Sequence, residues 1–291
     1  MRVVVAGASG FIGTALVARL RRDGHDVARL VRRAPMAGDE RGWDPPAGKI
    51  DPGALDGADA VVNLCGAPMW TRRWTGARKQ ALVDSRVEPT EVLAAAVAEH
   101  GVPVLLNQSA TGYYGDTSGT VDESGPQGAG FTAELCARWE HATAGAGDAR
   151  VVRMRTGPVL ADHGGMLGPI RPFFALGLGG RLGSGRQHMP WIHLDDAIAA
   201  MLFLLRADIA GPVNLVGPTP ATNTEFTRAF AETRRRPAPF FVPKAAMRLA
   251  MGELADDALR DQRVLPKVLL DNGFRFTYPT VRDALAATEG R

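Results

Sequence analysis

Apolar and polar residues follow each other along the first half of the chain in blocks of two kinds. Short, β-branched apolar runs predict strands at residues 3–6, 27–31, 60–64, 102–107 and 150–154. Segments with apolar residues at helical spacing predict helices at residues 11–22, 77–100 and 131–144. Nearly continuous apolar strands joined by crossover helices indicate a parallel sheet covered on both faces. We therefore predict an α/β protein with a Rossmann doubly wound sheet.

The pattern changes after about residue 160, where glycine is dense between residues 164 and 185 and proline punctuates residues 212–243. Such segments favour loops that form a pocket over regular structure. We expect a nucleotide-binding Rossmann domain over residues 1–162, completed by late elements from about 191–217. Residues 163–190 and 218–291 then make a smaller C-terminal part that binds substrate.

Composition narrows the class of function. The formal net charge of +3 is too small to indicate a nucleic acid partner, and no apolar run approaches the roughly 18 residues that span a bilayer. The chain starts directly with a strand pattern, so we expect no signal peptide, no membrane partner and a cytoplasmic protein. Two cysteines and six scattered histidines give neither a disulfide framework nor the spacing of a metal site.

Three glycines, Gly7, Gly10 and Gly13, lie three residues apart between the first strand and the first helix. Residues without a side chain let the backbone turn tightly and approach a pyrophosphate, which the helix N-terminus then binds through its free amides. The same spacing also occurs in plain tight turns, but the flanking strand, helix and second strand favour a dinucleotide site.

The second strand ends in Arg32 and Arg33, where an NAD-binding chain carries an acidic residue for the ribose hydroxyl. A guanidinium accommodates the 2′-phosphate of the phosphorylated coenzyme. The pair predicts NADP(H), although two solvated loop arginines would have the same sequence.

Several segments together resemble one family. They are the glycine loop, "DAVVNLCGAP" at 59–68, "SATGYYG" at 109–115, "LGLGGRLGSGRQHMPWIHLDD" at 176–196 and the ending "QRVLPKVLLDNGFRFTYP". The chain is similar to the extended short-chain dehydrogenase/reductases of the NAD-dependent epimerase/dehydratase superfamily, in the atypical "epimerase family protein" subgroup with its own C-terminal extension. The resemblance implies an NADP(H)-binding oxidoreductase or epimerase and, by analogy, a possible homodimer.

The resemblance also implies which residues contact the coenzyme. Beside Arg33, they are Gly7, Ser9, Gly10, Phe11, Ile12, Gly13, Arg32, Leu64, Cys65, Gly66, Arg86 and Val159. Arg86 would otherwise be interpreted as an exposed helix arginine.

The chain departs from that superfamily at its catalytic pair, a tyrosine followed by a lysine four residues later. Phe131 and Leu135 occupy the matching positions, and no lysine occurs between residues 80 and 243. A lysine one turn from a tyrosine lowers the pKa of the phenol and lets it act as an acid or base. Neither Phe131 nor Leu135 can transfer a proton, so both are predicted to be pocket packing.

Other polar residues could take part in catalysis or binding. Ser109 matches the family's serine that contacts a substrate carbonyl, and Tyr113 and Tyr114 follow it at the predicted carboxyl edge of the sheet. We predict that Arg186 grips a substrate phosphate or carboxylate. Gln187 and Trp191 are expected to line the same pocket.

His193, Asp195 and Asp196 are interpreted as structural, with Asp195 at a helix N-cap. Glu134 is expected to be an exposed helix residue.

Two functions remain open from the sequence. The first is an NADP-dependent oxidoreductase or epimerase that acts on an unidentified small carbonyl or alcohol. The second is a catalytically weak or inactive NADP(H)-binding sensor or regulatory protein, which the loss of the tyrosine–lysine pair favours.

Overall fold

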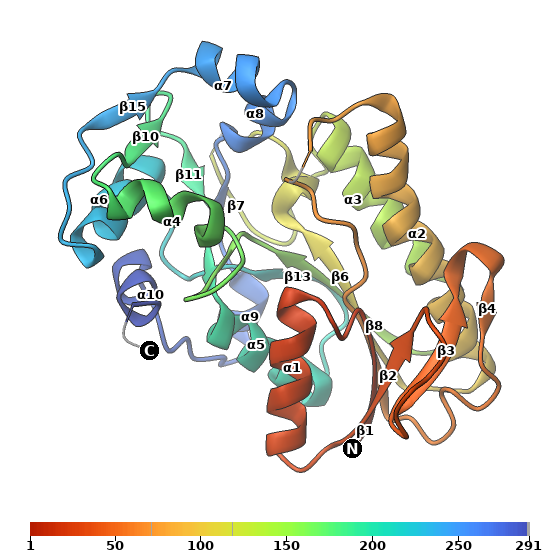
Figure 1. The fold of residues 1–291 in the computed structure, drawn as a ribbon. Coiled ribbons are helices and arrows are strands. Elements are labelled where there is room, and N and C mark those ends of the chain that lie inside the picture. The colour runs from red at the N-terminus through yellow and green to blue at the C-terminus, as the bar shows by residue number, and fades with distance from the viewer. Residues whose placement is uncertain (71, 118, 290–291) are drawn as a thin grey trace.

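The computed structural model describes residues 1–70, 72–117 and 119–289, and an eight-stranded sheet lies at its centre (Figure 1). The strand order is β13 (Gly211–Leu215), β8 (Arg150–Thr156), β6 (Val104–Ala110), β5 (Ala60–Asn63), β1 (Arg2–Ala6), β2 (Asp26–Val31), β3 (Glu40–Asp44) and β4 (Lys49–Ile50). Neighbouring strands are parallel except for β3 and β4, which are antiparallel. The predicted Rossmann architecture is confirmed.

Helices cover both faces of this sheet (Figure 1). On one face, α1 (Phe11–Arg22) and α5 (Leu194–Arg206) pack against alternate strand residues such as Val3 and Val5. On the other face, α2 (Gly76–Glu99) packs against Val4 and Ala6, and α3 (Phe131–His141) lies beside α2. The alternation of contacts along β1 explains its unbroken apolar sequence.

The predicted elements differ from the observed ones mainly at their ends. The helix predicted over 131–144 ends at His141 and continues as a 3₁₀ turn, Ala142–Gly145. The sequence pattern missed β3 and β4, since β3 carries only one buried aromatic, Trp43, among polar residues.

A second group of short elements completes the fold around the sheet and its helices. It comprises the 3₁₀ turns η1 (Pro45–Ala47) and η2 (Thr111–Tyr114), the strands β7 (Thr120–Val121), β9 (Val159–Leu160), β10 (Gly180–Leu182), β11 (His188–Met189), β12 (Ile192–His193), β14 (Ala221–Thr222), β15 (Phe240–Val242) and β16 (Arg263–Val264), and the helices α4 (Leu167–Ala175), α6 (Asn223–Thr233), α7 (Lys244–Met251), α8 (Leu254–Ala258), α9 (Lys267–Asp271) and α10 (Val281–Ala287). Here β9 pairs with β12, β10 with β15, β11 with β14 and β7 with β16.

Candidate functional site

The order of the strands makes the carboxyl ends of β1 and β5 a topological switch point, where doubly wound sheets have their ligand crevice. The chain leaves β1 for β2 on one side, and then crosses over to β5 on the other side of β1. Helices that diverge from such neighbouring strands leave an open edge, which is where ligands bind in doubly wound sheets. The loop after β1 is the glycine loop, and the loop after β5 contains Leu64, Cys65 and Gly66.

Glycine is required at both ends of the glycine loop. Gly7 has a φ of +75°, and a Cβ there would lie 2.7 Å from the carbonyl carbon and oxygen of Leu64. A Cβ on Gly13 would overlap the carbonyl oxygen of Gly7. The two loops are therefore in backbone contact at Gly7, where a side chain would force them apart, whereas a side chain at Gly13 would distort the glycine loop itself.

The first turn of α1 is open to an anion. Its N-cap is Gly10, no side chain caps it, and no acidic residue lies in the turn. Ser9 and Gly10 are exposed, whereas Gly13 is buried against the loop. Free amides and the positive end of the helix dipole favour a phosphate at this position.

A second segment packs against the mouth of the glycine loop. Positions Gly164 and Gly165, which follow β9, lie so close to the Phe11 ring that a Cβ on either would be 3.0–3.1 Å from ring atoms. His163 contacts the same ring edge to face, with centroids 6.1 Å apart. Val159, a predicted coenzyme contact, begins this segment and is buried.

The two predicted 2′-phosphate arginines have different surroundings. Arg33 makes a bidentate ion pair with buried Glu40, with N–O distances of 2.7 and 2.9 Å, and this pair lowers the pKa of Glu40 to about 2. Arg32 is exposed, and its charge acts on Cys65 across the crevice. Burial nevertheless raises the pKa of the Cys65 thiol to about 12, so this cysteine stays protonated at neutral pH. Because Arg33 is paired with Glu40, Arg32 is the arginine of this pair whose guanidinium is available to bind a ligand.

Arg86 lies buried beneath the loop after β5. Its guanidinium donates to the carbonyl oxygens of Leu82 and Ala67, both at 3.0 Å, and a Cβ on Gly66 would be 3.1 Å from its central carbon. No carboxylate lies within ion-pairing distance of Arg86 in the described residues, and burial lowers its pKa to about 10. A nearby anion would stabilise this buried charge.

The hydroxyls of Ser109 and Tyr114 belong to a buried polar network. Glu140 on α3 accepts hydrogen bonds from Ser109 Oγ at 2.8 Å and from Arg155 Nε and Nη2 at 2.8 and 2.9 Å. Arg155 Nη1 also donates to the Tyr114 hydroxyl at 3.0 Å, and that hydroxyl donates to Asn214. Burial raises the pKa of Tyr114 to about 12. The hydroxyls of Ser109 and Tyr114 are thus buried and hydrogen-bonded to protein groups.

Tyr113 differs from Tyr114 because it is partly exposed. The Arg155 guanidinium lies 3.5 Å from the centroid of its ring, at the carboxyl edge of the sheet. This is the one of the three candidate catalytic hydroxyl residues that reaches the surface.

Phe131 and Leu135 do pack as expected, and the structure adds a lysine that the sequence did not suggest. Both residues lie in an apolar cluster with Trp74 and with Leu254 of α8. Lys79, from the first turn of α2, lies with its ammonium nitrogen 5.1 Å from the Phe131 ring centroid and pairs with Glu253 at 2.6 Å. No local signal relates Lys79 to Phe131, because their contact depends on how α2 packs beside α3.

Two of the three predicted substrate residues are part of the core. Trp191 is 1% exposed and packs on Gly217, and Gln187 is buried and donates to the carbonyl oxygen of Leu182 at 2.9 Å. Neither side chain reaches the surface, a burial that the polar sequence around them does not reveal, and their role as substrate residues stays a prediction. Arg186 is exposed, as a ligand contact would be.

The prediction that Asp195 is a helix N-cap is wrong. The N-cap of α5 is His193, whose Nδ1 accepts from the Asp195 amide at 3.1 Å. Asp196 instead accepts from the amides of Thr277 and Tyr278 and so fixes the C-terminal segment to α5.

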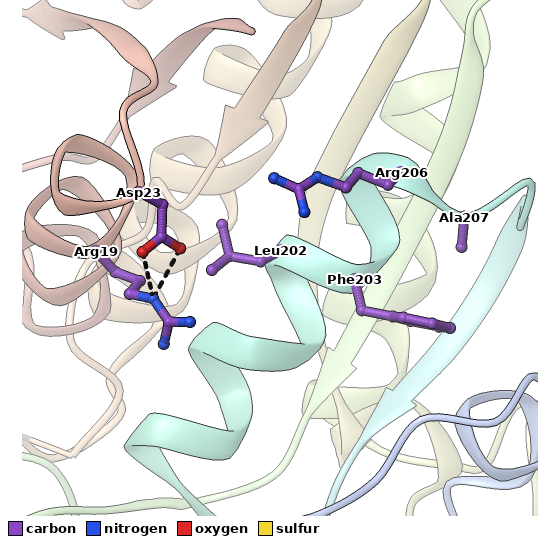
Figure 2. Close-up of a pocket in the computed structure, with 6 residues that line it drawn as sticks. All are labelled: Arg19, Asp23, Leu202, Phe203, Arg206 and Ala207. Atoms are coloured by element: carbon purple, nitrogen blue, oxygen red, sulfur yellow. Dashed lines mark hydrogen bonds and ion pairs between the residues drawn. The ribbon is translucent and has the colours of Figure 1, made fainter.

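Two surface pockets lie away from the crevice. One, of about 370 Å³, is formed by the C-terminal ends of α1 and α5, at the opposite end of α1 from the glycine loop (Figure 2). Arg19 and Asp23 on its wall are paired with each other at 2.9 Å. The other, of about 400 Å³, lies between α6 and residues 236–241. Within residues 1–70, 72–117 and 119–289 there is no helix long and apolar enough to cross a membrane, and no cluster of three metal-ligating side chains.

Comparisons with known proteins agree with this geometry. Residues 3–217 match the NAD dependent epimerase/dehydratase family, and residues 242–288 match a domain of unknown function, DUF1731. The epimerase family protein Mb2239 of Mycobacterium bovis is 52% identical over 288 residues, which cover 97% of this chain and 96% of the relative.

Two solved structures are similar over the full length of this chain. The crystal structure of the human epimerase family protein SDR39U1 (isoform 2) with NADPH superposes with a TM-score of 0.92 at 33% identity, covering 99% of each chain. A nucleoside-diphosphate sugar epimerase from Corynebacterium glutamicum has a TM-score of 0.82 at 34% identity and matches 100% of this chain and 58% of its own.

Proposed function

Because the chain belongs to the NAD dependent epimerase/dehydratase family, we propose that it binds NADP(H) and acts as an oxidoreductase on a small carbonyl or alcohol. The observation that carries the proposal is the geometry of the switch point between β1 and β5, which is called the crevice here. Its two loops touch through Gly7 and Leu64, and the first turn of α1 presents uncapped amides to it. These features suit a diphosphate, and the NADPH bound by the similar human protein supports the phosphorylated coenzyme.

The residues around the crevice have distinct roles in this proposal. The amides of the Gly7–Gly13 loop bind the pyrophosphate, Arg32 binds the 2′-phosphate, and Arg33 holds the strand end in place through Glu40. The Leu64–Gly66 loop and Arg86 form the facing wall, while Phe11 and Val159 close the mouth. When bound, NADPH supplies the hydride. The chain itself must then orient the carbonyl and deliver one proton.

Two groups could deliver that proton. Tyr113 has a partly exposed phenol ring stacked on Arg155, and Lys79 has its ammonium above the Phe131 ring. The phenol is the donor predicted from the sequence, and the ammonium lies 5.1 Å from the ring of Phe131, the residue that matches the superfamily's tyrosine. Ser109 and Tyr114 act by holding the η2 turn through Glu140 and Arg155.

A second function is favoured by the packing of Phe131 and Leu135. Both belong to an apolar cluster that Leu254 completes, so the usual proton-transfer position is apolar. An NADP(H)-binding sensor or regulatory protein would bind the coenzyme in the crevice without catalysing hydride transfer.

Coenzyme titration tests the first part of the proposal. NADPH fluorescence should report tight binding, and NADH should bind much more weakly. Arg32→Ala should weaken NADPH binding about tenfold or more and leave NADH unchanged, because a charged hydrogen bond to the 2′-phosphate is lost. Arg22→Ala, an exposed arginine at the far end of α1, is the matched control. Equal affinity for the two coenzymes in the natural chain contradicts the assignment of Arg32.

A panel of aldehydes, ketones and quinones tests the second part. Turnover of NADPH should fall in Tyr113→Phe or in Lys79→Gln, while NADPH affinity stays unchanged. The variant that loses turnover identifies the donor. If no panel member is reduced although NADPH binds, the sensor function replaces the oxidoreductase.

A further inference from the structure

The pocket between α6 and residues 236–241 has a composition unlike that of the cofactor crevice. Its walls carry three arginines and two phenylalanines from three separate parts of the chain: Arg181 on β10, Arg228 on α6, Arg236 after α6, and Phe240 and Phe241 on β15. The volume of about 400 Å³ is in the range of small-molecule sites.

The three arginines of this pocket form no direct ion pair among the described residues, although the charge of Arg228 acts on Glu225, three residues earlier on α6. Among the residues that the structure describes, no carboxylate lies within 4 Å of the guanidinium of Arg181, Arg228 or Arg236. The one acidic residue on the wall, Glu232, already pairs with Arg282 at 2.7 Å. Three guanidiniums around one hollow repel each other, and an anion placed between them relieves that repulsion.

Backbone geometry brings the third arginine to the pocket. Helix α6 ends in a turn in which Arg236 donates its amide to the carbonyl oxygen of Ala231 at 3.1 Å. The preceding residue, Arg235, has a φ of +52° and is the one described non-glycine residue with a positive φ. Helices usually carry glycine at this position, since a side chain is strained there. After this turn, Arg236 lines the same pocket as Arg228 on α6.

The apolar wall of the pocket is formed by two phenylalanine rings that are exposed to solvent. Phe240 and Phe241 are 52% and 58% exposed, although they belong to a strand. Arg181 and Phe241 are directly paired across β10 and β15, and the guanidinium carbon lies 6.0 Å from the ring centroid. The arrangement offers flat apolar surface next to positive charge.

We propose that this pocket is a second ligand site, separate from the cofactor crevice, and that it binds an organic phosphate. The phosphate lies between Arg181, Arg228 and Arg236, whose planar forks match its oxygens. The apolar body of the ligand lies on Phe240 and Phe241. A second copy of this chain does not fit the same surface, because a symmetric contact would face one arginine cluster with the other.

Calorimetry with phenyl phosphate tests the site directly. The protein is first saturated with NADPH, so that the glycine loop is not available to the probe. Phenyl phosphate should bind, and the double variant Arg228→Gln/Arg236→Gln should weaken it by at least about tenfold, because charged hydrogen bonds are lost. Phe241→Ala should weaken phenyl phosphate and leave inorganic phosphate unchanged.

Phosphatidylcholine vesicles with and without phosphatidic acid distinguish a lipid headgroup from a free phosphate ester. Sedimentation with the phosphatidic acid vesicles that depends on Arg228 and Arg236 identifies the lipid as the source. Phenyl phosphate binding without sedimentation identifies a free ester.

Three results would overturn the proposal. They are no binding of either probe, unchanged binding in the double variant, or an equal loss in Arg22→Gln, which removes an exposed arginine of α1 outside the pocket. NADPH affinity and melting temperature of each variant verify that the fold is intact, and Arg181→Gln provides an independent variant from another strand. NADPH binding is measured separately, so failure of this site leaves the proposed function untouched.

Discussion

Replacing Glu140 by glutamine, which exchanges one carboxylate oxygen for an amide NH2 group, should strongly destabilise the protein. Glu140 and Arg155 are side chains with 6% and 4% exposure, and they form a bidentate pair at 2.8 and 2.9 Å. Burial opposes the charge of Arg155, but the hydrogen bonds and the charge of Glu140 outweigh it and raise the pKa of the guanidinium. The Glu140→Gln variant loses this support, but a guanidinium is so basic that Arg155 is expected to stay charged near neutral pH.

The expected cost follows from this geometry. Glutamine keeps one acceptor oxygen, but its amide group points donor hydrogens at the donors of Arg155, and the buried positive charge has no counterion left. Breaking a buried pair from one side costs about 3–5 kcal/mol. At about 2–4 °C per kcal/mol for a chain of this size, the melting temperature should fall by about 6–20 °C.

Urea unfolding without coenzyme measures the change, since bound coenzyme would add its own stabilisation. Glu134→Gln is the matched control, because Glu134 is exposed on the same helix and should change the free energy of unfolding by less than about 1 kcal/mol. The double variant Glu140→Leu/Arg155→Met should be more stable than Glu140→Gln, since it leaves no unpaired charge. A cost below about 1 kcal/mol for Glu140→Gln, or a double variant that is the least stable of all, would refute this reasoning.

Three further results are expected. Gly13→Ala should abolish NADPH binding in a fluorescence titration, because its Cβ would overlap the Gly7 carbonyl oxygen; binding within twofold of the natural chain would contradict the loop geometry. The folded-state pKa of Tyr114, about 12 because of burial, exceeds the value near 10 of an unfolded tyrosine, so its contribution to stability is complete below about pH 10 and is lost between about pH 10 and 12. Urea midpoints across that range should fall less steeply in Tyr114→Phe, and parallel curves would argue against this assignment. Arg235→Gly should raise the free energy of unfolding by up to about 1 kcal/mol, because glycine adopts a positive φ without strain; a loss of stability would show that the arginine side chain outweighs the backbone term.

The parts of the fold that depend on local chemistry could be predicted from the sequence. Buried parallel strands are apolar throughout, and the turn at Gly7–Gly13 needs glycine for reasons that the sequence itself displays. The parallel sheet and the position of the glycine loop followed from these two signals. Strand β3 could not be predicted, because its residues are mostly polar and it owes its place to pairing with β2.

The site was less predictable, because its side chains find partners far away in the sequence. Arg32 and Arg33 look equivalent in the chain, but only Arg33 meets Glu40, which β3 places beside it. Ser109 lies near the end of β6, beyond the predicted strand 102–107, and its hydroxyl donates to Glu140, 31 residues later, on α3. Lys79 reaches Phe131 only because α2 and α3 pack together.

The C-terminal extension supplies polar contacts around Phe131 and the start of α3. Glu253 pairs with Lys79, and Thr132 at the start of α3 donates to Asp257 at 2.7 Å. Burial raises the pKa of Asp257, which costs stability that the hydrogen bond from Thr132 and the charge of Arg260 oppose. A partly buried carboxylate therefore lies at this interface, where burial opposes its charge and Arg260 and Thr132 favour it. The extension therefore shapes the environment of Phe131 as well as covering it, and activity has to be sought with residues 242–288 in place.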